Sequence, residues 1–383
     1  MTITSQKQAL FGASILSFIL GSVHSFSVLL LVMEVKFDVS RSAASLTYSL
    51  ALISIAIAVL FGHRFYHRFR PPIYVTATGV LAATGCILAA LSPTAPLVWV
   101  GFGLIFGAAN GLGYGYALQF SGRAYRDRKG FAMGVITASY ALGAVVFPLP
   151  LRLAIELGGW SMALLFLALC LLVFSAISAL MLAQSKITYT HDAETAGQTI
   201  TGMRSQIILL WLSYCGAVTA GLMVIGHATG VSETRGGGAF WIVAAPIVIA
   251  TANMAGSMLG GILIDRVRGH IVLASLAALS SITLLSMAFV SNLMFTLMGL
   301  AVIGFTYGGT IAAYPAYISN RFGGSLGTVV YGRVFTAWAA AGLLGPLAAG
   351  LLFDTYSNYR LALILAAIAA LGSAYLMAVK NRS

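Results

Sequence analysis

Hydrophobic residues fill long stretches of this sequence, and short polar segments separate them. Each stretch reaches roughly 20 residues, which lets one α-helix cross the hydrocarbon core of a bilayer. Strict alternation of hydrophobic and polar residues, as in a membrane-spanning strand, is not seen. The pattern predicts an all-α integral membrane protein with twelve transmembrane helices, near residues 8–33, 42–62, 72–92, 97–122, 130–154, 159–184, 205–230, 237–262, 270–290, 293–319, 327–352 and 358–380.

The longest polar segment lies in the middle of the chain. Residues 185–204 are rich in threonine, glycine and charged residues, and six predicted helices lie on either side. This composition is typical of a loop between domains. We expect an N-terminal six-helix half at 1–184, a cytoplasmic linker at 185–204 and a C-terminal six-helix half at 205–383.

Matching segments occur in the two halves. Gly261 opens the segment Gly-Ile-Leu-Ile-Asp-Arg-Val-Arg-Gly between two hydrophobic stretches, and Gly62 opens a basic segment at the corresponding place in the first half. Gly62 and Gly261 are 199 positions apart, and at the same spacing the pair Thr137-Ala138 recurs as Thr336-Ala337. We interpret the halves as parallel repeats, an arrangement that puts a binding site near the membrane midplane.

Composition supports a membrane protein, because 60% hydrophobic and 8% charged residues leave too little polar surface for a soluble globule of 383 residues. The net charge of +12 is spread over loops rather than gathered on a face with interleaved aromatic residues, so we expect no nucleic-acid partner.

The basic residues predict the orientation. If the first helix starts in the cytoplasm, 16 of the 21 basic residues lie on that side: Lys7, Arg64, Arg68, Arg70, Arg123, Arg126, Arg128, Lys129, Lys186, Arg204, Arg266, Arg268, Arg321, Arg333, Lys380 and Arg382. The other five are Lys36, Arg41, Arg152, Arg235 and Arg360. This positive-inside bias predicts a multi-pass protein of the cell inner (plasma) membrane with both termini in the cytoplasm.

The Gly261 segment has the pattern G-x-L-x-D-R-x-x-G, which resembles a loop of the major facilitator superfamily. In that family the loop lies between helices two and three, and its match in the second half joins helices eight and nine. The resemblance implies the major facilitator fold and a conformational latch made by Gly62, Gly261, Asp265 and Arg266. We expect Asp265 to accept hydrogen bonds from nearby arginines and from the start of the eleventh helix. Tyr66 holds the matching position in the first half, so the latch should be one-sided.

A narrower resemblance, to the monocarboxylate and oxalate:formate branch of this superfamily, runs through nearly the whole chain. It rests on residues 21–26, 41–44, 221–227 and 332–338, on Asn253 with Gly256, and on Gly345-Pro346. The branch commonly has an arginine where Ser257 stands, and oxalate carriers have a lysine where Trp338 stands. Burying two carboxylates without these cations would cost on the order of several kcal/mol each, so an oxalate carrier is not expected.

Few ionisable side chains lie inside the predicted helices, since all nine acidic residues fall at helix ends or in loops. His24 lies near the centre of the first helix, His227 in the outer part of the seventh, and Arg333 about 9 Å into the eleventh. Groups at such depth are candidates for a cavity site. The alternatives are structural histidines and an Arg333 that extends to the headgroups.

We expect His24 and His227 as proton-coupling candidates. The predicted substrate-binding residues are His24, Asn110, Tyr114, Tyr140, Asn253, Tyr307, Tyr331, Arg333 and Trp338.

Together these features predict a secondary active transporter, working as symporter or antiporter by alternating access, for a small organic anion of the monocarboxylate type. Protons are a candidate co-substrate. The alternative is an efflux transporter for a neutral or amphipathic small molecule, which the two missing cations favour. A non-transporting sensor on the same fold is a third alternative, which a flux measurement would test.

An enzyme is not expected, because the predicted helices hold no clustered carboxylates and no nucleophile with a base. Cys86, Cys170 and Cys215 show no paired or metal-binding spacing, and we expect no cofactor and no metal. The expected partners are the solute and the lipid bilayer, and the expected state is a monomer.

Overall fold

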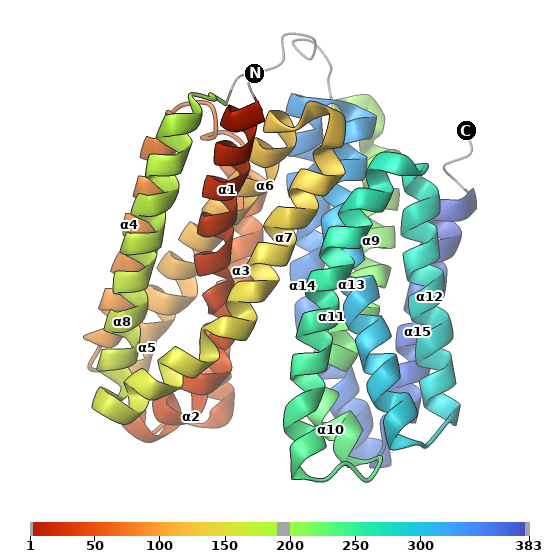
Figure 1. Ribbon diagram of the computed structural model, residues 1–383. Coiled ribbons are helices and arrows are strands. Elements are labelled where there is room, and N and C mark those ends of the chain that lie inside the picture. The colour runs from red at the N-terminus through yellow and green to blue at the C-terminus, as the bar shows by residue number, and fades with distance from the viewer. Residues whose placement is uncertain (1–2, 190–199, 380–383) are drawn as a thin grey trace. The chain divides into compact units, whose positions relative to one another are not determined.

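The computed structural model describes residues 3–189 and 200–379, and every regular element in these two ranges is a helix (Figure 1). Among the described residues, 11 helices are long and apolar enough to cross a membrane. This confirms the predicted all-α membrane class. Residues 190–199, the middle of the predicted linker, lie outside the described residues.

The first half of the chain forms eight α-helices and three other helical segments. They are α1 (Ile3–Leu20), the 3₁₀ segment η1 (Gly21–Ser25), α2 (Phe26–Phe37), α3 (Arg41–Gly62), α4 (Pro71–Ala90), α5 (Ala95–Val98), the π-helical η2 (Trp99–Phe106), α6 (Gly107–Ala124), the 3₁₀ segment η3 (Arg126–Arg128), α7 (Lys129–Val146) and α8 (Pro148–Ser185). Local sequence fixes two of these starts. The Ser40 hydroxyl accepts a hydrogen bond from the Ala43 N–H, and Pro71 occupies the first position of α4, where no backbone donor is needed.

The second half begins with a 3₁₀ turn and continues as seven α-helices. They are η5 (Ile200–Met203), α9 (Arg204–Ile225), α10 (Ala228–Glu233), α11 (Ala239–Arg266), α12 (Gly269–Phe289), α13 (Leu293–Phe322), α14 (Gly324–Tyr356) and α15 (Arg360–Val379). The Asn292 side chain caps α13 through a 2.9 Å hydrogen bond from the Phe295 N–H. The predicted seventh helix, 205–230, ends five residues earlier, and α10 follows as a separate short helix.

One membrane-spanning stretch, Arg126–Ser185, covers 60 residues. At 1.5 Å per residue this is long enough for two crossings, and it contains the predicted fifth and sixth helices. The break is at Gly158 and Gly159, whose backbone angles are not helical, with φ at +68° in Gly159. Glycine adopts this left-handed value without the penalty of a Cβ, so the chain reverses here. Each of the other ten stretches overlaps one predicted helix.

The predicted first helix, 8–33, is not continuous. It changes to a 3₁₀ turn at Gly21–Ser25 before helix α2 resumes. The Asn110 side chain donates a 2.6 Å hydrogen bond to the Leu20 carbonyl, an oxygen that an uninterrupted α-helix would use for its own ladder. Gly21 lies so close to Tyr140 that a Cβ would overlap the Tyr140 carbonyl oxygen. The break therefore follows from a neighbouring polar side chain and a close helix crossing.

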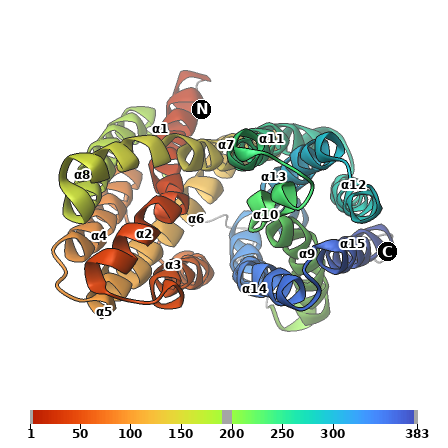
Figure 2. The same cartoon turned by 90° about the horizontal axis from the view of Figure 1, so that it is seen from below.

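Internal contacts divide the chain into two compact units. Unit 1 contains the described residues up to Arg126 and those from Ser139 to 189. Unit 2 contains Asp127–Ala138 and the described residues from 200 on. The first part of α7 thus belongs to unit 2 and its last part to unit 1. In unit 1, α8 packs against α1 and α4, and α3 packs against α6. In unit 2, α11 packs against α13, α12 against α15, and α9 against α14 (Figure 2).

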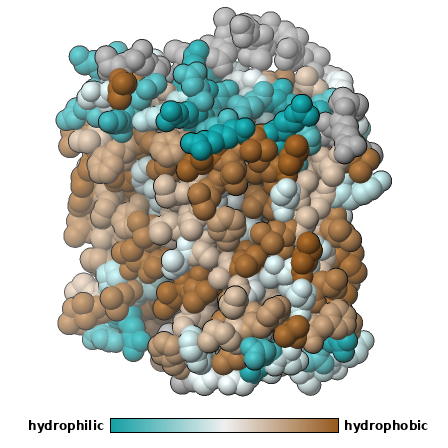
Figure 3. Space-filling model, turned by 45° about the vertical axis from the view of Figure 1, so that its right-hand side comes forward, coloured by the Kyte–Doolittle hydropathy of each residue, from teal (hydrophilic) through white to brown (hydrophobic). Residues whose placement is uncertain are grey.

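The surface has the composition that a bilayer requires. On the face drawn in Figure 3, hydrophobic side chains form a band between two hydrophilic ends. Leu149 and Leu157 on α8 and Ile282 on α12 are among many large apolar side chains that stay exposed. Exposed apolar area on this scale is not stable in water. The protein is therefore a multi-pass membrane protein.

Candidate functional site

His24 lies in the 3₁₀ break between α1 and α2, inside a membrane-spanning stretch. Its Nδ1 is 2.6 Å from the Tyr48 hydroxyl oxygen on α3. Its ring meets the Tyr140 ring of α7 edge to face, with centroids 5.4 Å apart. All three side chains are half-buried. Three helical segments of unit 1 thus bring a titratable imidazole and two phenols together.

Asn110 holds this group in place from α6. The Tyr140 hydroxyl donates a 2.9 Å hydrogen bond to Asn110 Oδ1, while Asn110 Nδ2 donates to the Leu20 carbonyl. Asn110 is fully buried, and the Tyr114 ring lies 4.8 Å from that of Tyr140. Four predicted binding residues, His24, Asn110, Tyr114 and Tyr140, therefore form one cluster in unit 1. Asn110 positions Tyr140 rather than presenting its own amide.

Unit 2 brings together a second, aromatic cluster. The Trp338 indole N–H of α14 donates a 2.8 Å hydrogen bond to the Tyr307 hydroxyl of α13. The Phe335 ring stacks on Trp338 at 5.3 Å, and Tyr331 lies one turn earlier against Phe335. An indole has one donor, and Tyr307 uses it here. Trp338 is buried, and its one donor is not available for a further hydrogen bond.

Asn253 lies on α11 at a close crossing with α13. A Cβ added at Gly308 would overlap the Asn253 backbone and side chain. The buried Ser257 hydroxyl donates a 3.3 Å hydrogen bond to Asn253 Oδ1, one turn back on the same helix. At the position where the resembling branch has a cation, this protein has a hydroxyl that pairs within its own helix.

Arg333 is exposed, and among the described residues no hydrogen bond or ion pair to its guanidinium is found. Helix α14 begins at Gly324 instead of near Gly327, which places Arg333 about 14 Å from the helix start rather than about 9 Å. The neighbouring Thr336 accepts a hydrogen bond from the Trp211 indole of α9. Arg333 is thus an exposed cation at depth in a membrane-spanning helix.

His227 does not join either cluster. It lies between α9 and α10, with Nε2 2.9 Å from the Pro346 carbonyl oxygen and Nδ1 3.3 Å from the Tyr359 hydroxyl. The carbonyl requires that Nε2 carry the hydrogen, which leaves Nδ1 as acceptor for Tyr359. Both ring nitrogens have partners, an arrangement that favours the structural alternative for this histidine.

Asp265, the central residue of the predicted latch, caps a helix start. Its Oδ1 accepts a 2.7 Å hydrogen bond from the Gly130 N–H, and its Oδ2 accepts a 2.8 Å bond from the Phe131 N–H. Both donor N–H groups lie in the first turn of α7, which corresponds to the fifth predicted helix. The expectation that Asp265 would bind the start of the eleventh helix is therefore wrong, although the chemistry, a carboxylate at a helix N-terminus, is as expected.

The glycines of the latch serve close approach. A Cβ at Gly261 would overlap the Gly130 carbonyl oxygen and would lie 2.9 Å from Gly134 Cα. In unit 1, Gly62 lies instead against Tyr66, which is buried among the rings of Tyr74, Tyr116 and Tyr189. Arg266 is exposed and bonds neither Asp265 nor another described residue. The position that is acidic in the second half is part of an aromatic cluster in the first.

Sequence reasoning did not identify Tyr48 as a site residue, although it contacts His24 directly. It is the one tyrosine in the predicted helix 42–62, and that was the available signal. Phe335 was missed as a partner of Trp338. The two residues are three positions apart, so they share one face of α14. Seven of the nine acidic residues are described, and all lie in loops or near helix ends. Asp192 and Glu194 lie outside the described residues.

Comparison with known proteins assigns the family. A family model described as Major Facilitator Superfamily matches residues 10–346. The MFS-type transporter YhjX of Escherichia coli (strain K12) is 26% identical over 82% of this chain and 80% of its own length. The oxalate:formate antiporter of Oxalobacter formigenes is 22% identical over 80% of this chain and 75% of its own. Monocarboxylate transporter 13 of Rattus norvegicus is 23% identical over 91% and 82%.

Solved structures agree on the fold. The transporter FucP in its outward conformation superposes with a TM-score of 0.72 at 18% identity, covering 99% of this chain and 100% of its own. The proton:xylose symporter XylE gives a TM-score of 0.73 at 13% identity, covering 98% and 96%. With the family model matching most of its length, this chain belongs to the Major Facilitator Superfamily of membrane transporters.

Proposed function

We propose that the protein transports a small organic anion of the monocarboxylate type across the inner membrane by alternating access, with a proton as co-substrate. The observation that carries the proposal is the cluster of His24, Tyr48, Tyr140 and Asn110 in unit 1. Histidine is the side chain whose ordinary pKa, near 6.5, allows it to gain and lose a proton at physiological pH. Within the described membrane spans no carboxylate lies at comparable depth.

Arg333 supports an anionic solute. A guanidinium stays charged at every accessible pH and binds a carboxylate through two parallel hydrogen bonds. One permanent cation matches one carboxylate. Ser257 and Trp338, where the resembling branch has cations, leave a second carboxylate without a partner, so a monocarboxylate is favoured over oxalate. The relatives named for monocarboxylates and for oxalate and formate are consistent with this class.

In the proposed cycle His24 takes a proton while its site is open to the outside. The charged imidazole then attracts the anion, and both leave after the protein opens to the cytoplasm. Tyr48 and Tyr140 orient the ring, and Asn110 fixes Tyr140. Both termini are cytoplasmic in this scheme, and the protein works as a monomer.

A second candidate function is efflux of a neutral or amphipathic molecule. The aromatic cluster of unit 2 favours it, because the buried rings of Trp338, Phe335 and Tyr331 make an apolar aromatic surface inside the unit and the indole N–H is already used. Such surfaces bind apolar solutes without a charge partner.

Uptake by purified protein in liposomes separates the two functions. Labelled lactate, pyruvate and formate are offered with and without an inward proton gradient, beside a lipophilic neutral dye. The proposal expects saturable uptake of at least one monocarboxylate, and accumulation when the outside is acidic. Dye transport without uptake of any acid would support the efflux function instead.

A further inference from the structure

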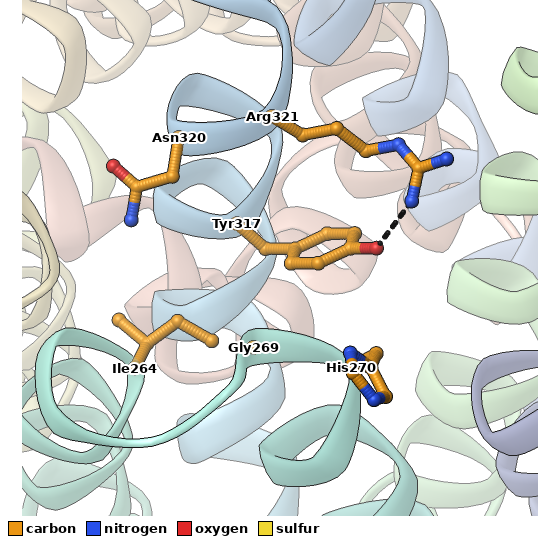
Figure 4. Close-up of a pocket in the computed structure, with 6 residues that line it drawn as sticks. All are labelled: Ile264, Gly269, His270, Tyr317, Asn320 and Arg321. Atoms are coloured by element: carbon orange, nitrogen blue, oxygen red, sulfur yellow. Dashed lines mark hydrogen bonds between the residues drawn. The ribbon is translucent and has the colours of Figure 1, made fainter. Parts of the chain in front are cut away.

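A cavity of about 270 Å³ opens at one end of unit 2, away from both clusters described above. It is lined by Ile264 at the end of α11, Gly269 and His270 at the start of α12, and Tyr317, Asn320 and Arg321 at the end of α13. In Figure 4 the Arg321 guanidinium, the Tyr317 hydroxyl and the His270 ring lie on the same side, and the Asn320 amide lies at the opposite end. Four hydrogen-bonding side chains thus surround one small space.

The arginine of this cavity is held in place. Arg321 Nη1 donates a 3.0 Å hydrogen bond to the Tyr317 hydroxyl, one turn back on α13. Tyr317 is buried, and its ring packs so closely on Gly269 that a Cβ there would come within 2.5 Å of the ring. A guanidinium with a fixed direction loses less conformational entropy when it binds a ligand. The glycine permits α12 to begin directly beside that ring.

The local charge is positive. Arg266 ends α11, Arg268 lies in the loop between α11 and α12, and both are exposed. The nearby acidic group, Asp265, directs both carboxylate oxygens to the start of α7, each accepting one backbone hydrogen bond there. The residue before α12, Arg268, provides no side-chain cap, and the positive end of that helix dipole adds to the field. The cavity is suited to an anion.

Its position indicates which anion. The lining residues lie at the ends of three membrane-spanning helices, at the level where phospholipid headgroups occur. Val267 and Ile271, next to the lining residues in sequence, are exposed aliphatic side chains that can contact acyl chains. Arginine binds phosphate oxygens in the same two-pronged way as a carboxylate. A free phosphate would share the headgroup chemistry but would make no use of the aliphatic residues.

We propose that this cavity is a phosphate-binding site for the headgroup of an anionic phospholipid, with Arg321 as the main phosphate ligand, His270 as a further donor on the same side, and Asn320 as a donor at the opposite end of the headgroup. The site is independent of the transported solute and of the proposed function. It would hold a lipid against the ends of α12 and α13.

Binding is measured on the delipidated full-length protein in detergent. The probes are dihexanoyl phosphatidylglycerol, dihexanoyl phosphatidylcholine and inorganic phosphate, and the readouts are native mass spectrometry and the shift in unfolding temperature. We expect phosphatidylglycerol to bind more tightly than either other probe. Arg321→Gln should weaken its binding about ten-fold, because charge-assisted hydrogen bonds are lost.

The matched control is Arg360→Gln, which removes a cation at the end of another membrane helix, outside the cavity. This variant should bind phosphatidylglycerol like the parent. Asn320→Leu and His270→Leu should each weaken binding about three-fold through one lost hydrogen bond. These two variants carry the test if Arg321→Gln unfolds in detergent. Equal weakening by the Arg321 and Arg360 variants, or no binding of phosphatidylglycerol, would overturn the proposal. Inorganic phosphate binding as tightly as the lipid would overturn the lipid as occupant.

Discussion

The carboxylate of Asp265 accepts a 2.7 Å hydrogen bond from the backbone N–H of Gly130. The first residue is the penultimate residue of α11, and the second lies in the first turn of α7, a helix that continues from unit 2 into unit 1. We propose that this contact is the conformational latch. It is strong because a full negative charge faces the positive end of a helix dipole and accepts two backbone donors.

Replacing Asp265 with asparagine removes the charge and one of the two acceptor oxygens. Stability should fall by up to about 1 kcal/mol, the usual contribution of a negative charge at a helix N-terminus. Transport should fall too, and a cysteine probe placed in the α11–α12 loop of a cysteine-free variant should change its labelling rate. Tyr66→Phe is the matched control, because the ring cluster of Tyr66, Tyr74, Tyr116 and Tyr189 keeps its packing. Equal effects of the two changes would contradict a one-sided latch.

The glycine contact beside Asp265 predicts a steric effect. A Cβ at Gly130 would overlap the Ile264 side chain and the Gly261 carbonyl oxygen, so Gly130→Ala should separate α7 from α11. We expect a loss of about 1–3 kcal/mol, as for overpacked sites, measured by thermal unfolding. Gly372→Ala on α15 is the control, since nothing lies within 4 Å of its added Cβ. A Gly130 variant as stable as the Gly372 variant would show that the close approach is not needed.

The orientation rests on the excess of basic residues on one side. Reporter fusions after Arg70, Arg128 and Arg268 should indicate the cytoplasm. Fusions near Pro93 and Glu233 should indicate the outside. Inversion of all sites within one half would contradict the six-plus-six arrangement.

Arg333→Gln tests the permanent cation. If Arg333 contacts the carboxylate, the variant should bind the solute about ten-fold more weakly at acidic and neutral pH alike, because a guanidinium does not titrate in this range. Binding is measured by competition in the liposome assay. Arg152→Gln, which removes an exposed partner of Glu156, should leave affinity unchanged. Unaltered affinity in Arg333→Gln would indicate an arginine that extends to the headgroups.

The sequence predicted the helices well because bilayer thickness sets their length. A run of about 20 apolar residues crosses the bilayer as an α-helix, since its backbone polar groups must bond within the segment. The sequence could not predict the break at Gly21–Ser25, since this depends on Asn110, a residue 90 positions from Leu20. The partner of Asp265 was assigned wrongly for the same reason. A carboxylate at a helix end indicates that it will cap a helix, but only the tertiary packing determines which one.

The candidate site was predicted in part. Depth in a hydrophobic stretch identified His24 and Arg333, because ionisable groups are costly there. Depth alone did not separate His24 from His227, whose partners Pro346 and Tyr359 lie more than 100 positions along the chain. Tyr48 carries no charge, so a search for ionisable residues in hydrophobic stretches does not identify it.

Proton coupling through His24 is the central claim, and His227 supplies its control. His227→Gln should lower the unfolding temperature through its lost contacts to Pro346 and Tyr359, yet keep proton-driven accumulation. The decisive comparison is His24→Gln, because glutamine retains hydrogen bonding near Tyr48 but cannot carry a proton in this pH range.

The measurement is accumulation of a labelled monocarboxylate by His24→Gln in liposomes with an acidic exterior, beside exchange of the same solute with no gradient. We predict that exchange continues near the parent rate while accumulation driven by the proton gradient is lost. Accumulation equal to that of the parent at both acidic and neutral pH would contradict the role of His24 in coupling, and would favour transport of a neutral solute.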